Sequence, residues 1–296
     1  MSRIHGFYQW ICLLFKIFNG RSVRTYGKDQ ISFIYERYRH EYLCTKKELI
    51  AAEGAIKKFS NLLKIVPVKL ITRIGPKKDS GYIAVDMFER PLLISGGAGK
   101  NIDFEVTFAE RGSQVLIFDP TIDILPKLHE NITHFKIGLE GEMSNKFKKS
   151  IDLNEIFKIA NANSLNNSGI YLKLDIEGSE WKLLDKNLKT LNHFDQIFIE
   201  FHDLHRLTDN SFRKSYLRVN KYLIENFYFV SLTSNNWSQF INFGKSFTPL
   251  VYECTLLNKR HKRLLKYRKS SSLKKLTYRN NPKRPFIYHK PFYLTD

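Results

Sequence analysis

The chain has 296 residues, 43% hydrophobic and 14% aromatic, so it can bury one sizeable core but is short for two full-size domains. The net charge of +19 is uneven: residues 1–47 hold 9 Lys/Arg against 3 Asp/Glu, residues 48–258 hold 26 against 25, and residues 259–296 hold 13 against 1. This composition excludes a chain disordered throughout, a collagen and a disulfide scaffold. A charge-balanced body therefore lies between two basic ends. The excess positive charge indicates the kind of partner that the ends contact and not the chemistry of the body.

The three cysteines, Cys12, Cys44 and Cys254, form no CxxC and no paired Cys/His ligand spacing. This pattern favours a protein of a reducing compartment, and it argues against a structural zinc site. The apolar segment Phe7 to Phe18 is about 12 residues long, whereas a membrane-spanning helix needs about 20. No signal-peptide cleavage pattern follows it. Two interpretations stay open, a terminal helix packed on the body and a helix lying at a membrane interface.

A helix is predicted to start at Thr45, because Thr45 and Glu48 have capping-box spacing and apolar residues follow at steps of three and four. After Pro67, short apolar runs alternate with polar and Gly-containing stretches, which is typical of alternating strands and helices. Seven strands are predicted, at 91–94, 115–118, 135–137, 170–174, 196–201, 227–232 and 250–257. Runs of consecutive apolar residues indicate parallel strands covered on both faces. No helical periodicity separates the last two strands, which predicts a direct antiparallel connection.

A turn containing glycines, Ser95 to Lys100, follows the strand at 91–94 and precedes a helical stretch at 104–110. Glycines at a strand-to-helix turn let backbone N–H groups approach a ligand that a Cβ atom would exclude. Asp119 ends the next strand, where an acid can hydrogen-bond both hydroxyls of an adenosine ribose. Together they predict an adenosine-type cofactor.

The absence of a third glycine from the turn distinguishes between the possible adenosine-type cofactors. A dinucleotide-binding turn has a third glycine at the position of Ile102, so that the helix N-terminus can face a pyrophosphate. Here that glycine is absent, and Asp103 and Glu105 at the helix start would repel a pyrophosphate but suit the cationic amino-acid end of S-adenosylmethionine. With the closing antiparallel strands, this favours the methyl donor over NAD(P).

A second cluster of polar residues lies between Tyr171 and Trp181, where a hydrophobic strand runs into two carboxylates, Asp175 and Glu177, and then a glycine. Open α/β sheets bind ligands at the carboxyl ends of their strands, where this turn must lie. The structural alternatives are that Asp175 caps the following helix and that Glu180 stabilises its first turn.

The next strand ends at Glu200 to His202, which brings a histidine to the same sheet edge. Histidine can take up a proton near neutral pH, as deprotonation of an attacking hydroxyl requires. A single histidine is more often structural, but this position makes His202 the candidate base, ahead of His205.

These residues resemble the FkbM-type S-adenosylmethionine-dependent methyltransferases over about residues 70–258. The resemblance is carried by Ser95 to Glu105, Phe118 to Pro120, Lys173 to Glu180 and Glu200 to His202, and also by Arg73 to Gly75 and Asp79 to Tyr82, where Ser80 replaces the first glycine of the family pattern. It implies a class I methyltransferase fold, an α/β fold with a seven-stranded mostly parallel sheet and a final antiparallel strand, and it implies O-methylation, commonly of sugars or polyketide-like products. We expect three parts: a helical N-terminal extension (1–68), the methyltransferase domain (69–258) and a basic tail (259–296).

The leading hypothesis is O-methyl transfer from S-adenosylmethionine to a hydroxyl, on a glycan or related small molecule. The expected cofactor-binding residues are Gly97, Ala98, Gly99, Glu105, Asp119 and Asp175; the expected catalytic residues are Asp175, Glu177 and His202. No resident metal is favoured, although Mg²⁺ held by Asp175, Glu177 and either His202 or Asp203 is a variant. The alternatives are an NAD(P)-dependent oxidoreductase and an RNA-binding methyltransferase, the latter indicated only by the tail.

The basic ends predict a cytoplasmic protein that contacts an anionic membrane surface, with nucleic acid not expected as a partner. Lys and Arg near such a surface contribute up to about 1 kcal/mol each, and the attraction falls away within a Debye length. A solvated tail without a partner is the alternative.

Overall fold

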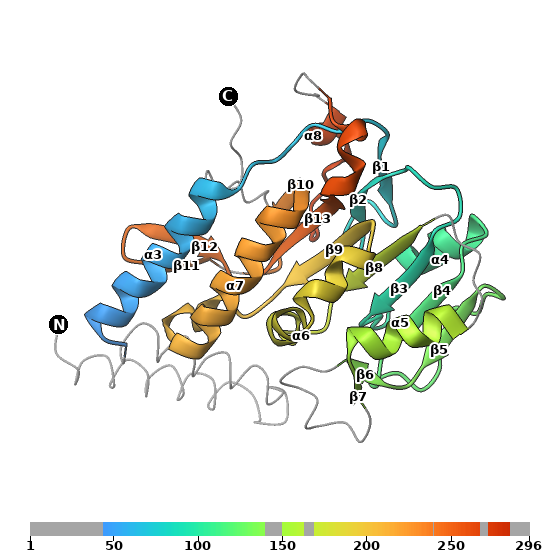
Figure 1. The fold of residues 1–296 in the computed structure, drawn as a ribbon, viewed down its shortest axis with the longest axis horizontal. Coiled ribbons are helices and arrows are strands. Elements are labelled where there is room, and N and C mark those ends of the chain that lie inside the picture. Colours follow the sequence, from blue (N-terminus) through green and yellow to red (C-terminus); the bar gives the residue numbers. More distant parts are fainter. Residues whose placement is uncertain (1–43, 140–149, 163–168, 239, 267–271, 285–296) are drawn as a thin grey trace.

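The computed structural model describes residues 44–139, 150–162, 169–238, 240–266 and 272–284. The main sheet has seven strands in the order β10-β13-β9-β8-β3-β4-β5 (Figure 1). Its strands are β3 (Leu92–Gly96), β4 (Val115–Phe118), β5 (Ile132–Phe135), β8 (Ile170–Leu174), β9 (Gln196–Phe201), β10 (Phe227–Ser234) and β13 (Tyr252–Asn258). Only β13 runs antiparallel to both neighbours. This order confirms the predicted class I methyltransferase fold.

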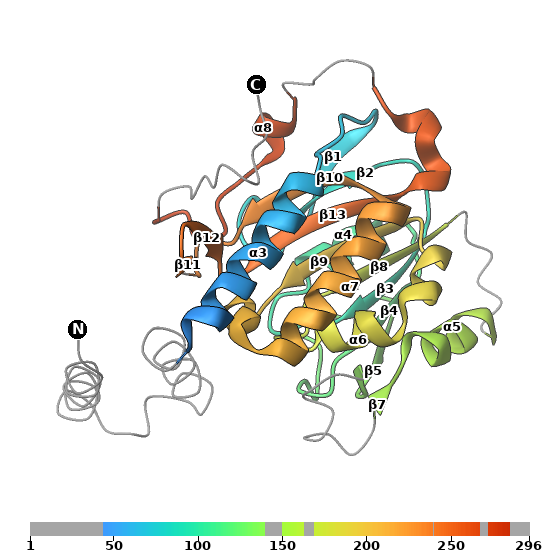
Figure 2. The same cartoon turned by 60° about the vertical axis from the view of Figure 1, so that its left-hand side comes forward.

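Helices cover both faces of this sheet. On one face, seen in Figure 2, lie α3, α6 and α7, with α5 nearer the β5 edge, and α4 covers the other face. Their bounds are α3 (Lys46–Leu62), α4 (Asp103–Glu110), α5 (Leu153–Ala162), α6 (Glu180–Lys186) and α7 (Asn210–Asn226), with short 3₁₀ helices η4 (Leu188–His193) and η5 (Leu204–Thr208). The inner strands β3, β4, β8 and β9 therefore bury side chains on both faces of the sheet, which explains their continuous apolar runs.

The predicted start of α3 is confirmed by its capping box. The hydroxyl oxygen of Thr45 accepts a hydrogen bond from the backbone N–H of Glu48 at 3.2 Å, and the backbone N–H of Thr45 donates to Oε2 of Glu48 at 2.7 Å. Ala52, Ile56 and Phe59 then bury one face of the helix against the sheet and α7. The helix thus belongs to the packed domain.

One strand prediction is wrong in position. The strand expected at 135–137 lies at Ile132–Phe135. After it the chain turns, and the backbone N–H of Ile137 donates a hydrogen bond to the carbonyl oxygen of Phe135 at 2.8 Å. An edge strand has only β4 as a partner and is half exposed, so its sequence need not be a continuous apolar run. The residues expected as the strand, 135–137, are therefore its last residue and the turn after it.

Three small two-stranded pairings were not predicted. They are β1 (Ile71–Ile74) with β2 (Tyr82–Val85), β11 (Phe240–Phe243) with β12 (Ser246–Pro249), and β6 (Gly138–Leu139) with β7 (Ser150–Ile151). The β11-β12 hairpin lies between β10 and β13, so the direct antiparallel connection is confirmed with one hairpin inserted. Its turn contains Gly244 at φ 65°, a left-handed conformation that glycine adopts at little cost.

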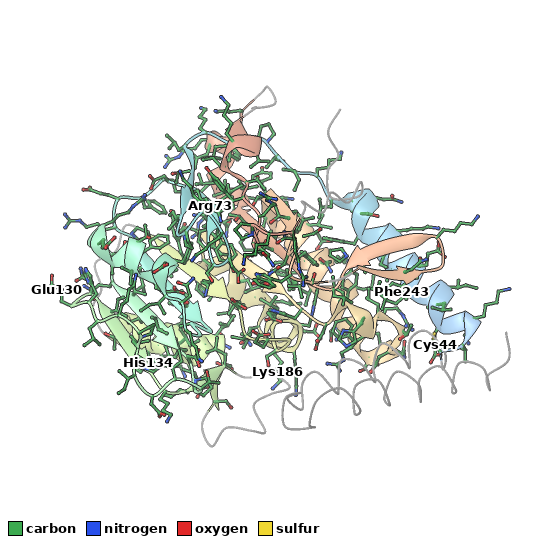
Figure 3. All side chains as sticks on the ribbon, turned by 180° about the vertical axis from the view of Figure 1, so that it is seen from behind. Cys44, Arg73, Glu130, His134, Lys186 and Phe243 are labelled. Carbon is green, nitrogen blue, oxygen red and sulfur yellow. The ribbon has the colours of Figure 1, made fainter. Side chains whose placement is uncertain are left out.

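Part of the basic tail packs on the domain. The 3₁₀ helix η6 (Lys259–Leu264) follows β13, and Arg260 forms an ion pair with the buried carboxylate of Asp195. Further along, α8 (Ser272–Leu276) contacts β1, and Arg73, labelled in Figure 3, donates to the carbonyl oxygen of Leu276 at 3.4 Å. Residues 259–296 were expected to form a separate basic tail, and these contacts with the domain were not predicted from the sequence.

Asn280 brings the tail to the main sheet. It is 6% exposed, and its amide nitrogen donates to Oε1 of Glu253 on β13 and, at 3.0 Å, to Oδ1 of Asp79. Asn281 beside it exchanges backbone hydrogen bonds with the side chain of Asn236, at 2.6 and 2.9 Å. Residues 272–284 therefore close one side of the domain.

Within the described residues, no helix is both long enough and apolar enough to cross a membrane. The segment Phe7 to Phe18, as well as Arg268 and Lys269 of the tail, lies outside the described residues. The contact of the basic ends with a membrane stays a prediction.

The contacts of Asn280 give a stability test. Asn280→Ala removes two donated hydrogen bonds to acidic groups and should lower the free energy of unfolding by about 1.5 to 3 kcal/mol. Asn280→Asp removes the same donors and adds a carboxylate next to Glu253 and Asp79, so it should destabilise the protein further. Urea unfolding of the two variants measures both effects, and equal stability of the aspartate variant and the native protein would contradict the packing of the tail.

Candidate active site

Four turns meet at the carboxyl edge of the main sheet. They follow β3, β4, β8 and β9 and carry Gly97, Asp119, Asp175 and His202 respectively. The chain continues from β3 to β4 on one side and returns to β8 on the other, so β3 lies at the point where the strand order reverses. Ligands of open α/β sheets bind in the crevice outside this point. The predicted residues are thus brought to one edge.

The glycine turn is held against the turn after β8. Gly97 has φ 76°, and a Cβ atom on it would lie 1.7 Å from the carbonyl oxygen of Asp175. The backbone N–H of Asp175 also donates to the carbonyl oxygen of Gly96 at 2.9 Å. Gly99 has φ 56°, but a Cβ atom there would meet no described atom within 4 Å. Of these two left-handed glycines, Gly97 is therefore the one that close approach of the neighbouring turn requires.

Asp119 lies where the sequence places it, but its carboxylate is engaged. Oδ2 accepts hydrogen bonds from the backbone N–H groups of Ala98 at 2.9 Å and Gly99 at 3.0 Å, and Oδ1 accepts from the N–H and hydroxyl of Thr121 at 2.8 and 2.6 Å. Burial opposes the charge, yet these hydrogen bonds dominate and lower the pKa of Asp119. Asp119 therefore shapes the glycine turn, and its contact with a ribose stays a prediction.

Glu105 lies beneath the glycine turn, and its position near the cofactor stays a prediction. It is fully buried behind the glycine turn, where its Oε1 accepts from the Ser95 hydroxyl at 2.7 Å and lies 3.0 Å from Nζ of Lys173. Lys173 in turn donates to the carbonyl oxygen of Gly97 at 2.8 Å. Burial opposes the charge of Lys173, but the carboxylates of Glu105 and Asp175 raise its pKa. Glu105 thus supports the turn through Lys173.

The turn after β8 presents Asp175 and Glu177 at the edge. Glu177 has φ 53°, its side chain is 80% exposed, and Gly178 follows with φ 98°. Glu180 is fully buried and accepts from the backbone N–H of Ile176 at 2.9 Å and of Gly178 at 3.1 Å. Burial raises the pKa of Asp175. Glu180 accordingly holds the turn before α6, whereas its structural alternative placed its effect in the first turn of that helix, and it leaves the other two carboxylates at the edge.

His202 is oriented by Glu180. Its Nδ1 lies 3.0 Å from Oε1 of Glu180, while its Nε2 lies 3.6 Å from Oε2 of Glu177 and 3.9 Å from Oε1 of Glu200. Burial opposes protonation, but the carboxylates of Glu180, Glu200 and Asp175 raise the pKa of His202 well above its usual value. The sequence therefore located the histidine correctly but did not show how strongly carboxylates surround it.

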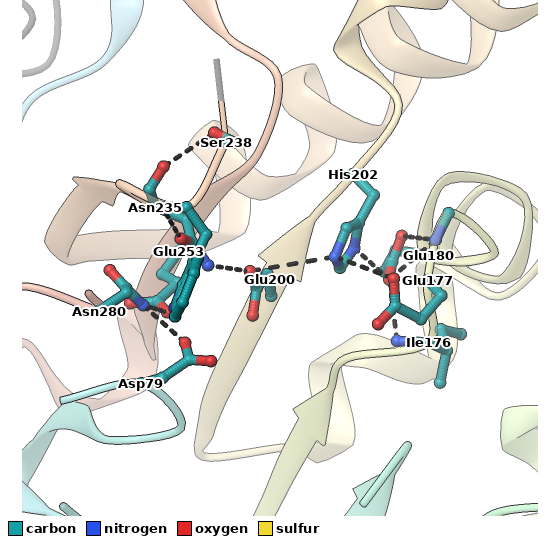
Figure 4. A network of polar contacts seen from close by, with 12 residues as sticks. Asp79, Ile176, Glu177, Glu180, Glu200, His202, Asn235, Ser238, Glu253 and Asn280 are labelled. Carbon is teal, nitrogen blue, oxygen red and sulfur yellow. Dashed lines mark hydrogen bonds and ion pairs between the residues drawn. The ribbon is translucent and has the colours of Figure 1, made fainter. Parts of the chain in front are cut away.

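Glu200 was not predicted as a site residue. It lies inside the apolar run of β9, and its Oε1 accepts from the amide of Asn235 at 2.6 Å. Figure 4 shows Glu200 between His202 and Asn235, with a second polar group formed by Glu253, Asn280 and Asp79 beside them. Burial raises the pKa of Glu253 to about 7. A glutamate inside a buried strand, two residues before a histidine at its end, was the available signal.

Searches against protein-family models and curated proteins give no match. Among solved structures, a Streptococcus pneumoniae protein provisionally assigned as a tRNA methyltransferase, with S-adenosyl-L-methionine, is 12% identical over 62% of this chain and 71% of that chain, with a TM-score of 0.31. A Burkholderia thailandensis 1,6-didemethyltoxoflavin-N1-methyltransferase with bound S-adenosylhomocysteine is 15% identical over 57% and 72%, with a TM-score of 0.28. A provisionally assigned hemolysin from Streptococcus thermophilus is 10% identical over 58% and 61%, with a TM-score of 0.30. At such low scores these likenesses carry no functional argument, and the FkbM resemblance stays a prediction.

The two glycines give a matched pair of substitutions. Gly97→Ala combines a left-handed backbone with a clash against the Asp175 carbonyl and should lower the free energy of unfolding by about 2 to 5 kcal/mol. Gly99→Ala has the backbone cost alone and should lose about 1 to 2 kcal/mol. Guanidinium unfolding followed by tryptophan fluorescence compares them. Equal losses would show that the two turns are not packed as described.

Proposed function

We propose that this protein is an S-adenosylmethionine-dependent methyltransferase that methylates a hydroxyl group of a glycan or related small molecule. The observation that carries the proposal is the glycine turn after β3, at the point where the strand order reverses in a sheet of class I methyltransferase topology. Fold alone does not define an activity, so the argument depends on the groups at this edge.

The charge of the edge supports a cationic ligand. Asp175, Glu177 and Glu200 all lie around one imidazole, while the nearby Lys173 is already paired with Glu105. The sulfonium and amino groups of S-adenosylmethionine are positive and would be attracted to such an edge, whereas a pyrophosphate would be repelled. Ile102, buried where a dinucleotide-binding turn has its third glycine, further disfavours NAD(P).

In the proposed reaction, the acceptor oxygen attacks the methyl carbon of the donor. A carbon–oxygen bond forms, the carbon–sulfur bond breaks, its electron pair stays on sulfur and S-adenosylhomocysteine leaves. The acceptor proton passes to the cluster of Asp175, Glu177 and His202. Most of the rate enhancement is expected from holding the oxygen in line with the sulfonium, and proton transfer adds about 10²- to 10⁴-fold.

Donor binding should depend on Asp119. Asp119→Ala leaves the N–H groups of Ala98 and Gly99 without their acceptor and removes the group predicted to hold the ribose, so affinity should fall at least tenfold. Isothermal titration calorimetry with S-adenosylmethionine measures this, with circular dichroism to verify folding. Unchanged affinity in a folded Asp119→Ala protein would reject the assignment of the donor site.

The chemical step should depend on Glu177 and His202. Either alanine variant should lower turnover about 10²-fold or more while donor affinity stays within a few fold, because these groups act on the acceptor. Mass spectrometry of glycans from cells with and without the gene identifies the methylated acceptor, which then serves in the assay. Loss of donor affinity equal to the loss of turnover would instead assign both residues to the donor site.

A further inference from the structure

Three side chains at the ends of β8 and β9 have the spacing of metal ligands. Asp175, Glu200 and His202 each offer one ligand atom, and these atoms all lie within 4.8 Å of one another. We propose that these residues bind a divalent cation, Mn²⁺ or Mg²⁺, at the acceptor side of the proposed methyl-donor site. From the sequence, no resident metal is favoured. The Mg²⁺ variant considered there uses Glu177 as a ligand, whereas the site proposed here uses Glu200. Only its catalytic use rests on the proposed function.

The separation of two of the ligand atoms is compatible with one shared ion. Nε2 of His202 and Oε1 of Glu200 are 3.9 Å apart. Two ligands bonded to one ion at about 2.1 Å are separated by about 3.0 Å when adjacent and about 4.2 Å when opposite in octahedral geometry. The observed distance lies between these limits. Two carboxylates with one imidazole match a cation that prefers oxygen and accepts nitrogen, as Mn²⁺ does.

Two of the three ligands are held by outer contacts. The Nδ1 atom of His202 is occupied by Oε1 of Glu180 at 3.0 Å, which turns Nε2 toward Asp175 and Glu200. Metal-binding histidines almost always have their second nitrogen engaged in this way, commonly by a carboxylate. Glu200 is fixed in turn by the amide of Asn235 at 2.6 Å. Both side chains are therefore oriented before any ligand arrives.

Tyr82 provides an independent indication of a ligand. Its side chain is 3% exposed, and its hydroxyl has no hydrogen-bond partner among the described residues. The ring of Tyr82 packs against Phe198, which lies two residues before Glu200 on β9 and so on the same face of the strand. A buried hydroxyl without a partner costs free energy. An oxygen ligand of the cation, from water or from the acceptor, would accept the hydrogen bond that Tyr82 lacks.

A cation at this position would bind the acceptor hydroxyl and lower its pKa. The ion would also balance the carboxylates of Asp175, Glu177 and Glu200, which otherwise share one imidazole. Glu177 is exposed and 3.6 Å from Nε2 of His202, so it is available as a further ligand or as the group that takes up the proton.

The test is a titration of the full-length protein with Mn²⁺ alone, followed by electron paramagnetic resonance. We expect one bound Mn²⁺ per chain, with electron spin-echo modulation from an imidazole nitrogen. Glu200→Gln should weaken Mn²⁺ binding at least tenfold because it removes a ligand, and His202→Gln should abolish the nitrogen modulation. Glu180→Gln, which keeps an acceptor for the backbone N–H groups of the turn but removes the charge that orients the histidine, should weaken binding about 10- to 100-fold. Glu110→Gln, at an exposed carboxylate, is the control and should bind as the native protein does.

Absence of one-to-one binding, or binding that Glu200→Gln leaves unchanged in a folded protein, would overturn the proposal and leave an imidazole–carboxylate cluster without metal. Titration of metal-free protein with S-adenosylmethionine is run in parallel. Donor binding without Mn²⁺ binding rejects the cation site and keeps the methyltransferase proposal, whereas Mn²⁺ binding without donor binding does the reverse.

Discussion

The contact between the glycine turn and the turn after β8 fixes the geometry of the whole sheet edge. The space between Gly97 and the carbonyl group of Asp175 is too small for a Cβ atom, and Asp175 donates its N–H to Gly96. Lys173 extends from β8 under the same turn and donates to Gly97. Because both turns are joined through backbone atoms, a shift of one must move the other. The proposed donor site and the carboxylates beside it are thus one rigid unit.

Two ion pairs, one fully buried and one partly buried, support this unit from behind. Lys173 pairs with Glu105 beneath the glycine turn, and His202 pairs with Glu180 beneath the turn after β8. A buried ion pair does not by itself stabilise a protein relative to apolar residues, because desolvation offsets the Coulomb attraction. Both pairs also donate to or accept from backbone groups of the turns, however. Their effect is therefore on the shape of the turns, since a hydrophobic replacement would leave those backbone groups unpaired.

The sequence predicted those features that neighbouring residues determine. The capping box at Thr45 and the strand at 196–201 involve local spacing or a continuous apolar run, and both are confirmed. The strand expected at 135–137 was misplaced because an edge strand carries a weak apolar pattern. Glu200 was missed because its environment depends on Asn235, which is 35 residues away, and on the pairing of β9 with β13. Contacts of this range leave no periodic trace in a single sequence.

The contacts of the tail with the domain were likewise not predictable from local sequence. The residue type that makes these contacts bears on the charge of the sheet edge. Residues 259–296 contain 13 Lys/Arg, yet the side chain that contacts Glu253 and Asp79 at the sheet edge is the neutral amide of Asn280. Asn235 engages Glu200 in the same manner. An amide satisfies a buried carboxylate by donating hydrogen bonds without neutralising it, whereas a lysine would cancel the charge. The carboxylates at this edge thus gain hydrogen bonds without a neutralising positive charge from the tail, which suits the proposed sulfonium donor and the proposed divalent cation.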